Sequence, residues 1–294
     1  MRLAELEFLK YLSECRTGFL NTFFEAITAL GEEALIIVVM ATVYYVFDKK
    51  LAQKVFFITM VSLSANGIVK NIARVPRPFA LGEILPVRGE TATGYSFPSG
   101  HTQNFSTWSM ALSLHFKKKF AIVLSLFLSL LVAFSRMYLG VHYPSDVIVG
   151  LALGLGFAVV GNILYDKVQN KNLLYILSSF ALTPFMIAFL ALGDPLFEDF
   201  FKFYGLFVGL ALSVVLEEKY IRIENGGKLW HRILRVAIGV AVAFSFKEGL
   251  KELFYSLEVS SLPRVALAFD SVRYFVIAVA EILVCPLLFK KIKI

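Results

Sequence analysis

Residues 119–165 read KFAIVLSLFLSLLVAFSRMYLGVHYPSDVIVGLALGLGFAVVGNILY, two long apolar runs joined by the polar segment SRMYLGVHYPSD. Each run is close to the ~20 residues that an α-helix needs to cross the hydrocarbon core of a bilayer. The joining segment holds Arg136, His142 and Asp146, residue types that are costly at membrane depth and that mark function there. This stretch therefore predicts a helical hairpin in a membrane with a polar site at its turn.

The rest of the chain repeats this alternation of long apolar runs and short polar clusters. Of its 294 residues, 58% are hydrophobic and 17% are charged, whereas soluble domains are roughly half apolar and a quarter charged. The pattern predicts an all-α, polytopic membrane bundle. The expected spans are residues 33–48, 52–73, 100–116, 119–138, 145–165, 173–192, 200–217, 231–249 and 267–289.

The first 32 residues differ from these runs, because charges interrupt their apolar side chains. Leu3, Leu6, Phe8, Leu9 and Leu12 alternate with Glu and Lys, a pattern that favours an amphipathic helix at the membrane surface. We therefore expect three parts: an interfacial segment at 1–32, a transmembrane core with the polar site at 33–170, and additional transmembrane helices at 171–294.

The basic residues predict the orientation of the chain. Lys and Arg are enriched in cytoplasmic linkers, and more than half of the 29 lie in alternate linkers. This arrangement predicts a multi-pass protein of the cell (inner) membrane with residues 74–99 and 139–144 on the non-cytoplasmic side. The net charge of +7 is spread between apolar runs, which favours membrane lipids as partners over nucleic acid. The cytoplasmic residues are Lys49, Lys50, Lys54, Lys117, Lys118, Lys119, Lys167, Lys171, Lys219, Arg222, Lys228, Arg232, Arg235, Lys290, Lys291 and Lys293.

Three cations are expected at the outer face. Lys70, Arg77 and Arg136 would repel one another unless an anion lies among them, and phosphate suits both Arg and Lys. Ser99 and Gly100 open an expected helix after a proline. Free N–H groups at a helix N-terminus favour anions, and glycine lets the backbone approach closely. The pattern predicts a phosphate-binding site.

A histidine and a carboxylate follow at helical spacing. His142 and Asp146 are four residues apart and share a face if a helix begins between them. A carboxylate that accepts a hydrogen bond from one ring nitrogen leaves the other free to attack, and His101 is available as an acid. Taken singly, each cation is more often a snorkelling span-end residue. The surrounding positive charge disfavours a metal ion, so no metal and no cofactor are expected.

These motifs also form a familiar set. Lys70-x6-Arg77-Pro78, Pro98-Ser99-Gly100-His101 and Ser135-Arg136-x5-His142-x3-Asp146 resemble the type 2 phosphatidic acid phosphatase (PAP2) superfamily over roughly residues 50–165. The resemblance implies a six-helix core and a metal-independent phosphatase. It implies that His142 forms a phosphohistidine, that Asp146 orients it, and that His101 protonates the leaving group. It also implies phosphate contacts from Lys70, Arg77, Arg136, Ser99 and Gly100.

The substrate class is less sharply indicated. A site between spans favours an amphiphile that enters from the lipid, such as an isoprenyl diphosphate, phosphatidate, lysophosphatidate, phosphatidylglycerol phosphate, sphingoid phosphate or lipid A. The alternatives are a soluble sugar phosphate, as in glucose-6-phosphatases, or a lipid phosphotransferase or transporter. Charges of the last third, such as Glu217, are expected mostly at span ends, where they can line a lateral entrance or a homodimer surface.

Overall fold

The computed structural model describes residues 2–256, 262–292 and 294, so Lys293 of the expected cytoplasmic set lies outside it. Within these residues the chain forms helices and no strands, which confirms the all-α prediction. The helices gather into two compact units. The first comprises Met1–Leu35 and Ala65–Leu164, and the second comprises Ile36–Ser64 and Tyr165–Ile294. The division of the chain into the three parts expected above stays a prediction.

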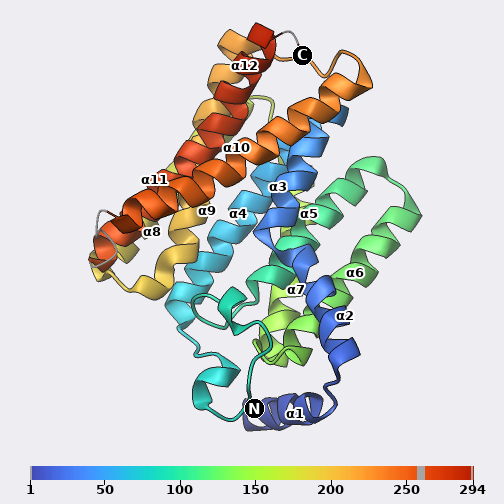
Figure 1. Cartoon of the computed structure of the whole chain (residues 1–294), viewed down its shortest axis with the longest axis vertical. Helices are drawn as coiled ribbons and strands as arrows, with labels where there is room; N and C mark the ends of the chain where they lie inside the picture. Colours follow the sequence, from blue (N-terminus) through green and yellow to red (C-terminus); the bar gives the residue numbers. More distant parts are fainter. Residues whose placement is uncertain (1, 257–261, 293) are drawn as a thin grey trace. The chain divides into compact units, whose positions relative to one another are not determined.

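The first unit contains the polar segments. It holds α1 (Arg2–Glu14), α2 (Gly18–Thr28), the end of α4 (Lys49–Ala73), α5 (Gly100–Phe116), α6 (Lys119–Tyr138) and α7 (Pro144–Lys167) (Figure 1). Helix α4 stops because Arg74 is left-handed, with φ of 48°, and because a proline two residues later cannot continue a helix. The turn from α6 to α7 contains Gly140 at φ 76°, a conformation that glycine adopts without strain.

Small residues hold α7 tightly against α5. A Cβ atom on Gly150 would lie 2.7 Å from the Ser99 carbonyl oxygen, and one on Gly154 would lie 2.0 Å from the Ser106 Oγ. This is the small-xxx-small spacing that lets membrane helices approach closely. The approach fixes the N-terminus of α5 beside the first turns of α7, and both helix ends carry predicted site residues.

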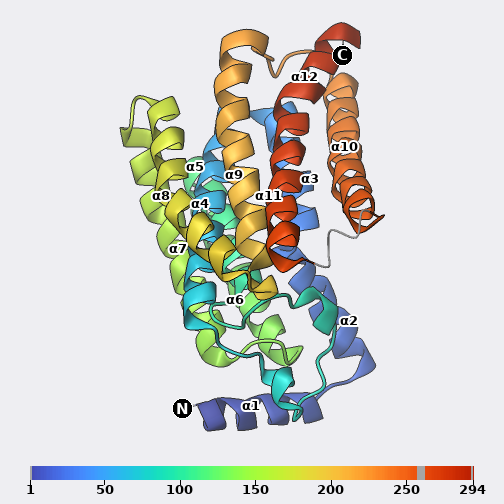
Figure 2. The same ribbon diagram turned by 90° about the vertical axis from the view of Figure 1, so that its left-hand side faces the viewer.

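The second unit holds the last third of the chain and the start of α4. Its helices are α8 (Lys171–Leu192), α9 (Glu198–Leu216), α10 (Leu229–Ser256), α11 (Pro263–Val279) and α12 (Cys285–Ile292), with α3 (Glu33–Thr42) divided between the units. Helices α9 and α11 lie side by side (Figure 2). Glu217 follows the last residue of α9, at a span end as expected, but its side chain is fully buried and pairs with Lys49 at 2.9 Å. A partner far away in sequence makes this burial tolerable.

All nine predicted spans lie on helices, but fewer helices are long and apolar enough to cross a membrane. Within the described residues there are six such segments, or seven if the bent pair Gly18–Gly31 and Glu33–Phe47 is one span. Of the nine expected spans, those on α5 and α10 are absent even from the seven, and the one at 33–48 is included only as part of the bent pair. Helix α5 is short and buries polar side chains such as Gln103 and Asn104 against other helices, so it needs no lipid-facing surface. The six segments are Lys49–Leu81, Lys119–Tyr138, Pro144–Lys167, Lys171–Leu192, Pro195–Ile221 and Pro263–Ile292.

Candidate active site

The first unit brings every predicted site residue to one end of its helices. Lys70 lies in the last turn of α4 and Arg136 in the last turn of α6. The α6–α7 turn carries His142, and the first turn of α7 carries Asp146. Most of these side chains are buried: Lys70, Arg77, Ser99, Arg136, His142 and Asp146 are each at most 6% exposed. So many buried polar groups require partners.

His142 is held between a carboxylate and a guanidinium. Its Nδ1 lies 3.3 Å from the Asp146 Oδ2, and its Nε2 lies 3.1 Å from the Arg77 Nη1. A guanidinium can only donate, so Nε2 accepts from it and the ring proton is on Nδ1, facing the carboxylate. The hydrogen-bond partners thus assign the tautomer that carries its proton on Nδ1 and its lone pair on Nε2.

Asp146 is itself fixed by two further donors. Its Oδ2 accepts a short hydrogen bond from the Ser96 Oγ and a bond of 3.0 Å from the Tyr143 backbone N–H. The second bond caps the N-terminus of α7, because Tyr143 precedes its first residue. Ser96 was missed by the sequence analysis. Its position two residues before the Pro98 motif is the only signal that pointed to it.

Arg77 is oriented by backbone carbonyls. The residue is extended, with φ of −75° and ψ of 155°, as expected for a residue that precedes a proline. Its Nε donates to the Gly94 oxygen at 3.0 Å and its Nη1 to the Val141 oxygen at 3.1 Å, while Nη2 donates to the Thr93 oxygen. The guanidinium is therefore fixed in place beside His142 Nε2.

Arg136 is buried with unused donors. Its Nη1 donates to the Thr28 Oγ1 at 2.7 Å, a contact between residues more than a hundred positions apart that no sequence pattern predicted. Its Nε and Nη2 have no hydrogen-bond partner among the described residues, and neither does the His101 Nε2. Leaving buried donors unpaired is costly, most of all charged ones. A phosphate oxygen would satisfy the unused donors of Arg136, and the His101 Nε2 can donate to the same oxygen in the tautomer that carries its proton there.

The N-terminus of α5 completes the cluster. Ser99 is the N-cap residue but makes no side-chain cap bond; its Oγ instead accepts from the Thr102 Oγ1 at 3.0 Å. A Cβ on Gly100 would lie 3.8 Å from the Lys70 Nζ, so this amine lies close to the start of the helix. The uncapped helix N-terminus and the amine together favour an anion at this end of α5.

The electrostatic environment keeps His142 neutral. Burial, followed by the positive charges of Arg77, Arg136 and Lys70, holds the pKa of the His142 imidazole well below its ordinary value of 6.5. The positive charges of Arg77, Arg136 and Lys70 also act on the His101 imidazole. A neutral imidazole is the form that can attack phosphorus. No group of three or more His, Cys, Asp or Glu residues in the described part of the chain is placed to hold a metal ion.

Two other arginines near the site have partners of their own. Arg88 forms an ion pair of 3.0 Å with Glu32. The Nε of Arg74 donates to the Asn71 backbone oxygen at 3.1 Å. Neither contact directs the guanidinium to His142.

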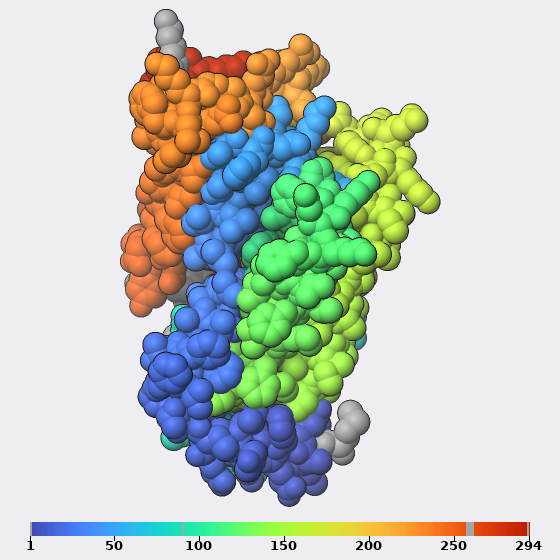
Figure 3. Space-filling view, turned by 90° about the vertical axis from the view of Figure 1, so that its right-hand side faces the viewer, coloured from blue at the N-terminus to red at the C-terminus, as the bar shows by residue number. Residues whose placement is uncertain are grey.

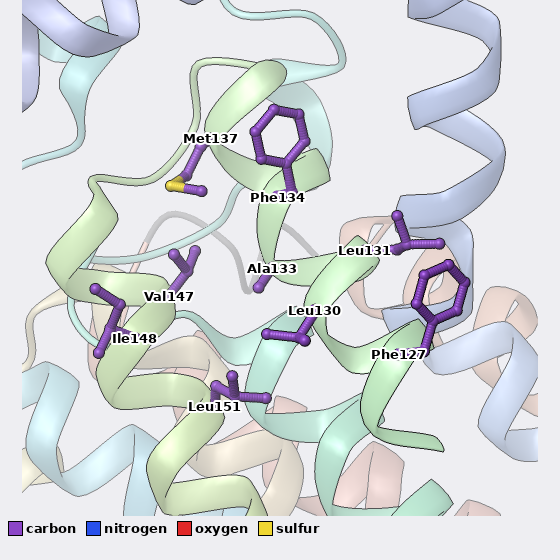
Figure 4. Close-up of a pocket in the computed structure, with 9 residues that line it drawn as sticks. All are labelled: Phe127, Leu130, Leu131, Ala133, Phe134, Met137, Val147, Ile148 and Leu151. Atoms are coloured by element: carbon purple, nitrogen blue, oxygen red, sulfur yellow. The ribbon is translucent and has the colours of Figure 1, made fainter. Parts of the chain in front are cut away.

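An apolar groove of about 410 Å³ lies between α6 and α7 (Figure 4). Met137 and Val147 line it, and each directly follows a site residue on its helix. Successive residues are about 100° apart around a helix, so the groove and the polar site occupy different faces of α6 and α7. The two helices therefore direct polar groups to one side and hydrocarbon-compatible side chains to the other. The lining residues are Phe127, Leu130, Leu131, Ala133, Phe134, Met137, Val147, Ile148 and Leu151.

The chain is similar to known proteins in two separate stretches of its sequence. Residues 51–170 match the PAP2 superfamily, and residues 201–294 match the transmembrane extension of PAP2 superfamily phosphatases. An undecaprenyl-diphosphatase of Sulfolobus acidocaldarius is 28% identical over 51% of this chain and 72% of its own. A lipid A 4'-phosphatase of Porphyromonas gingivalis is 30% identical over 50% of this chain and 65% of its own, slightly less than two thirds of that protein. A crystal structure of a transmembrane PAP2 type phosphatidylglycerolphosphate phosphatase from Bacillus subtilis superposes with a TM-score of 0.49 at 24% identity, covering 57% of this chain and 88% of that one.

Proposed function

The chain belongs to the PAP2 superfamily of phosphatases, and from this premise we propose that it hydrolyses a phosphorylated lipid through a phosphohistidine on His142. The observation that carries the proposal is the set of buried, unused donors on Arg136 and His101 beside a neutral His142 whose Nε2 accepts a hydrogen bond. An anion with several oxygens satisfies these donors together. Phosphate esters have this form.

The reaction has two steps. In the first, Nε2 of His142 attacks phosphorus, the bond to the leaving oxygen breaks, and His101 donates a proton to that oxygen. Asp146 stabilises the positive charge that develops on the imidazole, because Nδ1–H faces its carboxylate. In the second, His101 accepts a proton from water, which attacks the phosphohistidine and releases phosphate. Arg77, Arg136 and Lys70 neutralise the charge on the phosphoryl oxygens in both steps.

The proposed substrate is an amphiphile. The site lies at the ends of membrane helices, and the outward face of α6 and α7 carries an entirely apolar groove, so a hydrocarbon chain can stay in the lipid while its phosphate is bound. The relatives named above act on undecaprenyl diphosphate and on lipid A, both lipid phosphates. The proposal covers isoprenyl diphosphates, phosphatidate, lysophosphatidate, phosphatidylglycerol phosphate and sphingoid phosphates.

The protein is a multi-pass membrane protein. We place it in the cell (inner) membrane with the site on the non-cytoplasmic side, because the Lys-rich linkers alternate along the chain and leave residues 74–99 and 139–144 on the opposite face. A homodimer stays a prediction.

The test is phosphate release by the detergent-purified full chain, with EDTA present. A panel of lipid phosphates and glucose 6-phosphate is compared for the wild type and for His142→Ala. Release that survives EDTA, favours the lipids and disappears in His142→Ala supports the proposal. Preference for glucose 6-phosphate would overturn the lipid assignment. Transfer of phosphate to an added lipid, with little free phosphate, would replace hydrolysis by phosphotransfer.

A further inference from the structure

Helix α1 lies across the turn that carries His142. Figure 1 shows α1 at the end of the bundle near the turn between α6 and α7, and Figure 3 shows the dark-blue N-terminal residues covering the same end of the green ones. The inner face of α1 presents Leu6, Leu9 and Leu12, which form a buried cluster with Ile84 and Tyr143. Tyr143 directly follows His142, so the N-terminal helix is packed against the backbone of the site.

Glu5 connects this helix to the start of α7. Its Oε1 accepts the Ser145 backbone N–H at 2.8 Å, and its Oε2 accepts the Ser145 hydroxyl at 3.1 Å. The two residues are 140 positions apart, so local chain geometry cannot produce this contact. A carboxylate at a helix N-terminus is stabilised by the helix dipole, and two-point binding fixes its direction.

The Ser145 N–H is the one first-turn donor of α7 that needs an outside partner. Helices begin with N–H groups that have no partner inside the helix. Pro144 has no N–H, and the Asp146 N–H donates to the Tyr143 oxygen at 3.0 Å. The Tyr143 N–H is taken by the Asp146 carboxylate. Glu5 thus completes the cap of a turn whose other parts are a predicted catalytic carboxylate and the neighbour of the predicted nucleophile.

We propose that Glu5 is a positioning residue: its carboxylate holds the first turn of α7 so that the Asp146 carboxylate stays aligned with the His142 ring. The alignment matters because of the reaction proposed above, on which this inference rests: there the Asp146 carboxylate stabilises the charge that develops on the His142 ring. The Nδ1–Oδ2 contact is 3.3 Å, long for a hydrogen bond, so a small shift of the turn breaks it. Misplacement of reacting groups by about 1 Å can reduce turnover ~10²-fold.

Neighbouring contacts hold the other side of the same turn. Arg16 lies between α1 and α2 and donates from Nε to the Tyr138 oxygen at 3.1 Å and from Nη1 to the Leu85 oxygen at 2.6 Å. The Arg2 guanidinium lies 5.0 Å from the Tyr143 ring centroid and adds a cation–π contact. The segment from the end of α6 to the start of α7 is therefore held by the N-terminal region at both ends, and Glu5 makes the contact nearest Asp146.

The test compares Glu5→Ala and Glu5→Gln with Glu7→Ala in the detergent-purified full chain. Glu7 is an exposed carboxylate on the same helix and serves as the matched control. We expect Glu5→Ala to lower kcat by about 10- to 100-fold with KM changed less than about threefold, since positioning acts on the transition state. Glu5→Gln keeps an oxygen acceptor for the Ser145 N–H and should recover most of kcat. Glu7→Ala should match the wild type.

Two readouts separate this proposal from the proposed function. Hydrogen exchange of residues 139–148 should quicken in Glu5→Ala and stay unchanged in Glu7→Ala, and orthovanadate, a phosphate analogue, should bind Glu5→Ala at least about tenfold more weakly. Both are measurable even if no lipid phosphate is hydrolysed, an outcome that would defeat the proposed function alone. Unchanged exchange and vanadate affinity in Glu5→Ala would overturn the positioning role. The positioning role would also be overturned if Glu5→Ala had a lower melting temperature but a wild-type kcat at temperatures well below it, because Glu5 would then contribute only to stability.

Discussion

The Asp146→Asn substitution keeps the size of the side chain and removes its charge. An asparagine oxygen can still accept from the Tyr143 N–H and the Ser96 hydroxyl, the two fixed donors at this carboxylate, so the cap of α7 should persist. What disappears is the interaction with the imidazole, which becomes positively charged as His142 attacks. At the observed 3.3 Å, two unit charges interact with about 5 kcal/mol at an effective dielectric constant of ~20. Because about 1.36 kcal/mol corresponds to a factor of ten in rate, kcat should fall ~10³–10⁴-fold.

The assay is steady-state phosphate release from a lipid phosphate, with the melting temperature in detergent measured in parallel. The reasoning requires a melting temperature close to that of the wild type, so that the loss of rate can be assigned to charge. Glu7→Ala is a suitable control, because it removes an exposed carboxylate that lies outside the site. A loss below about tenfold in Asp146→Asn, with the fold intact, would refute the assigned role of the carboxylate.

Three further outcomes are expected. Burial and the neighbouring cations lower the pKa of the His142 imidazole, so it stays neutral at pH values below the ordinary histidine pKa. The acidic limb of the kcat/KM profile, corrected for substrate titration, should therefore lie below about pH 6.5. A limb above pH 7 would contradict this. Arg136→Met removes unused buried donors, so its melting temperature should equal or exceed that of the wild type. Its vanadate affinity and kcat/KM should fall ~10²–10³-fold. Activity equal to that of the wild type would exclude Arg136 from the site. Gly154→Ala places a methyl group against Ser106 and should destabilise the protein by about 1–3 kcal/mol in thermal melts. Gly156→Ala is the control: its methyl group meets nothing within 4 Å, so the same melts should show no loss of stability or a gain.

The sequence allowed the helices and the composition of the cluster to be predicted, because both depend on local patterns. Apolar runs mark helices whatever they pack against, and all nine expected segments are helical. The spacing of His142 and Asp146 pointed to this pair, but His142 lies in the turn before α7, and the contact forms because the Asp146 carboxylate reaches back over that turn. The number of membrane spans was not predictable in the same way. Helix α5 is polar because it packs among other helices, and a helix in that environment lacks the apolar signature of a span.

The supporting contacts depend on residues that are distant in the sequence. Thr28 meets Arg136, and Glu5 meets Ser145, each across more than a hundred positions. No periodicity relates such pairs, and each residue taken alone is an ordinary Thr or Glu of an amphipathic segment. The same holds for Glu217, whose burial depends on Lys49. Charges of this kind become interpretable only when the packing that surrounds them is known.

The two helix N-termini beside His142 are capped differently, and the difference bears on where an anion can bind. At α7, carboxylates occupy the available donors: Asp146 takes the Tyr143 N–H and Glu5 takes the Ser145 N–H. At α5, the N-cap Ser99 makes no side-chain cap bond, and the Lys70 amine lies close to Gly100. Negative charge thus repels phosphate from α7, while helix dipole and amine attract it to α5. In the proposed reaction the phosphoryl group would thereby be directed to the side of the ring where Nε2 lies, because Nδ1 already faces Asp146.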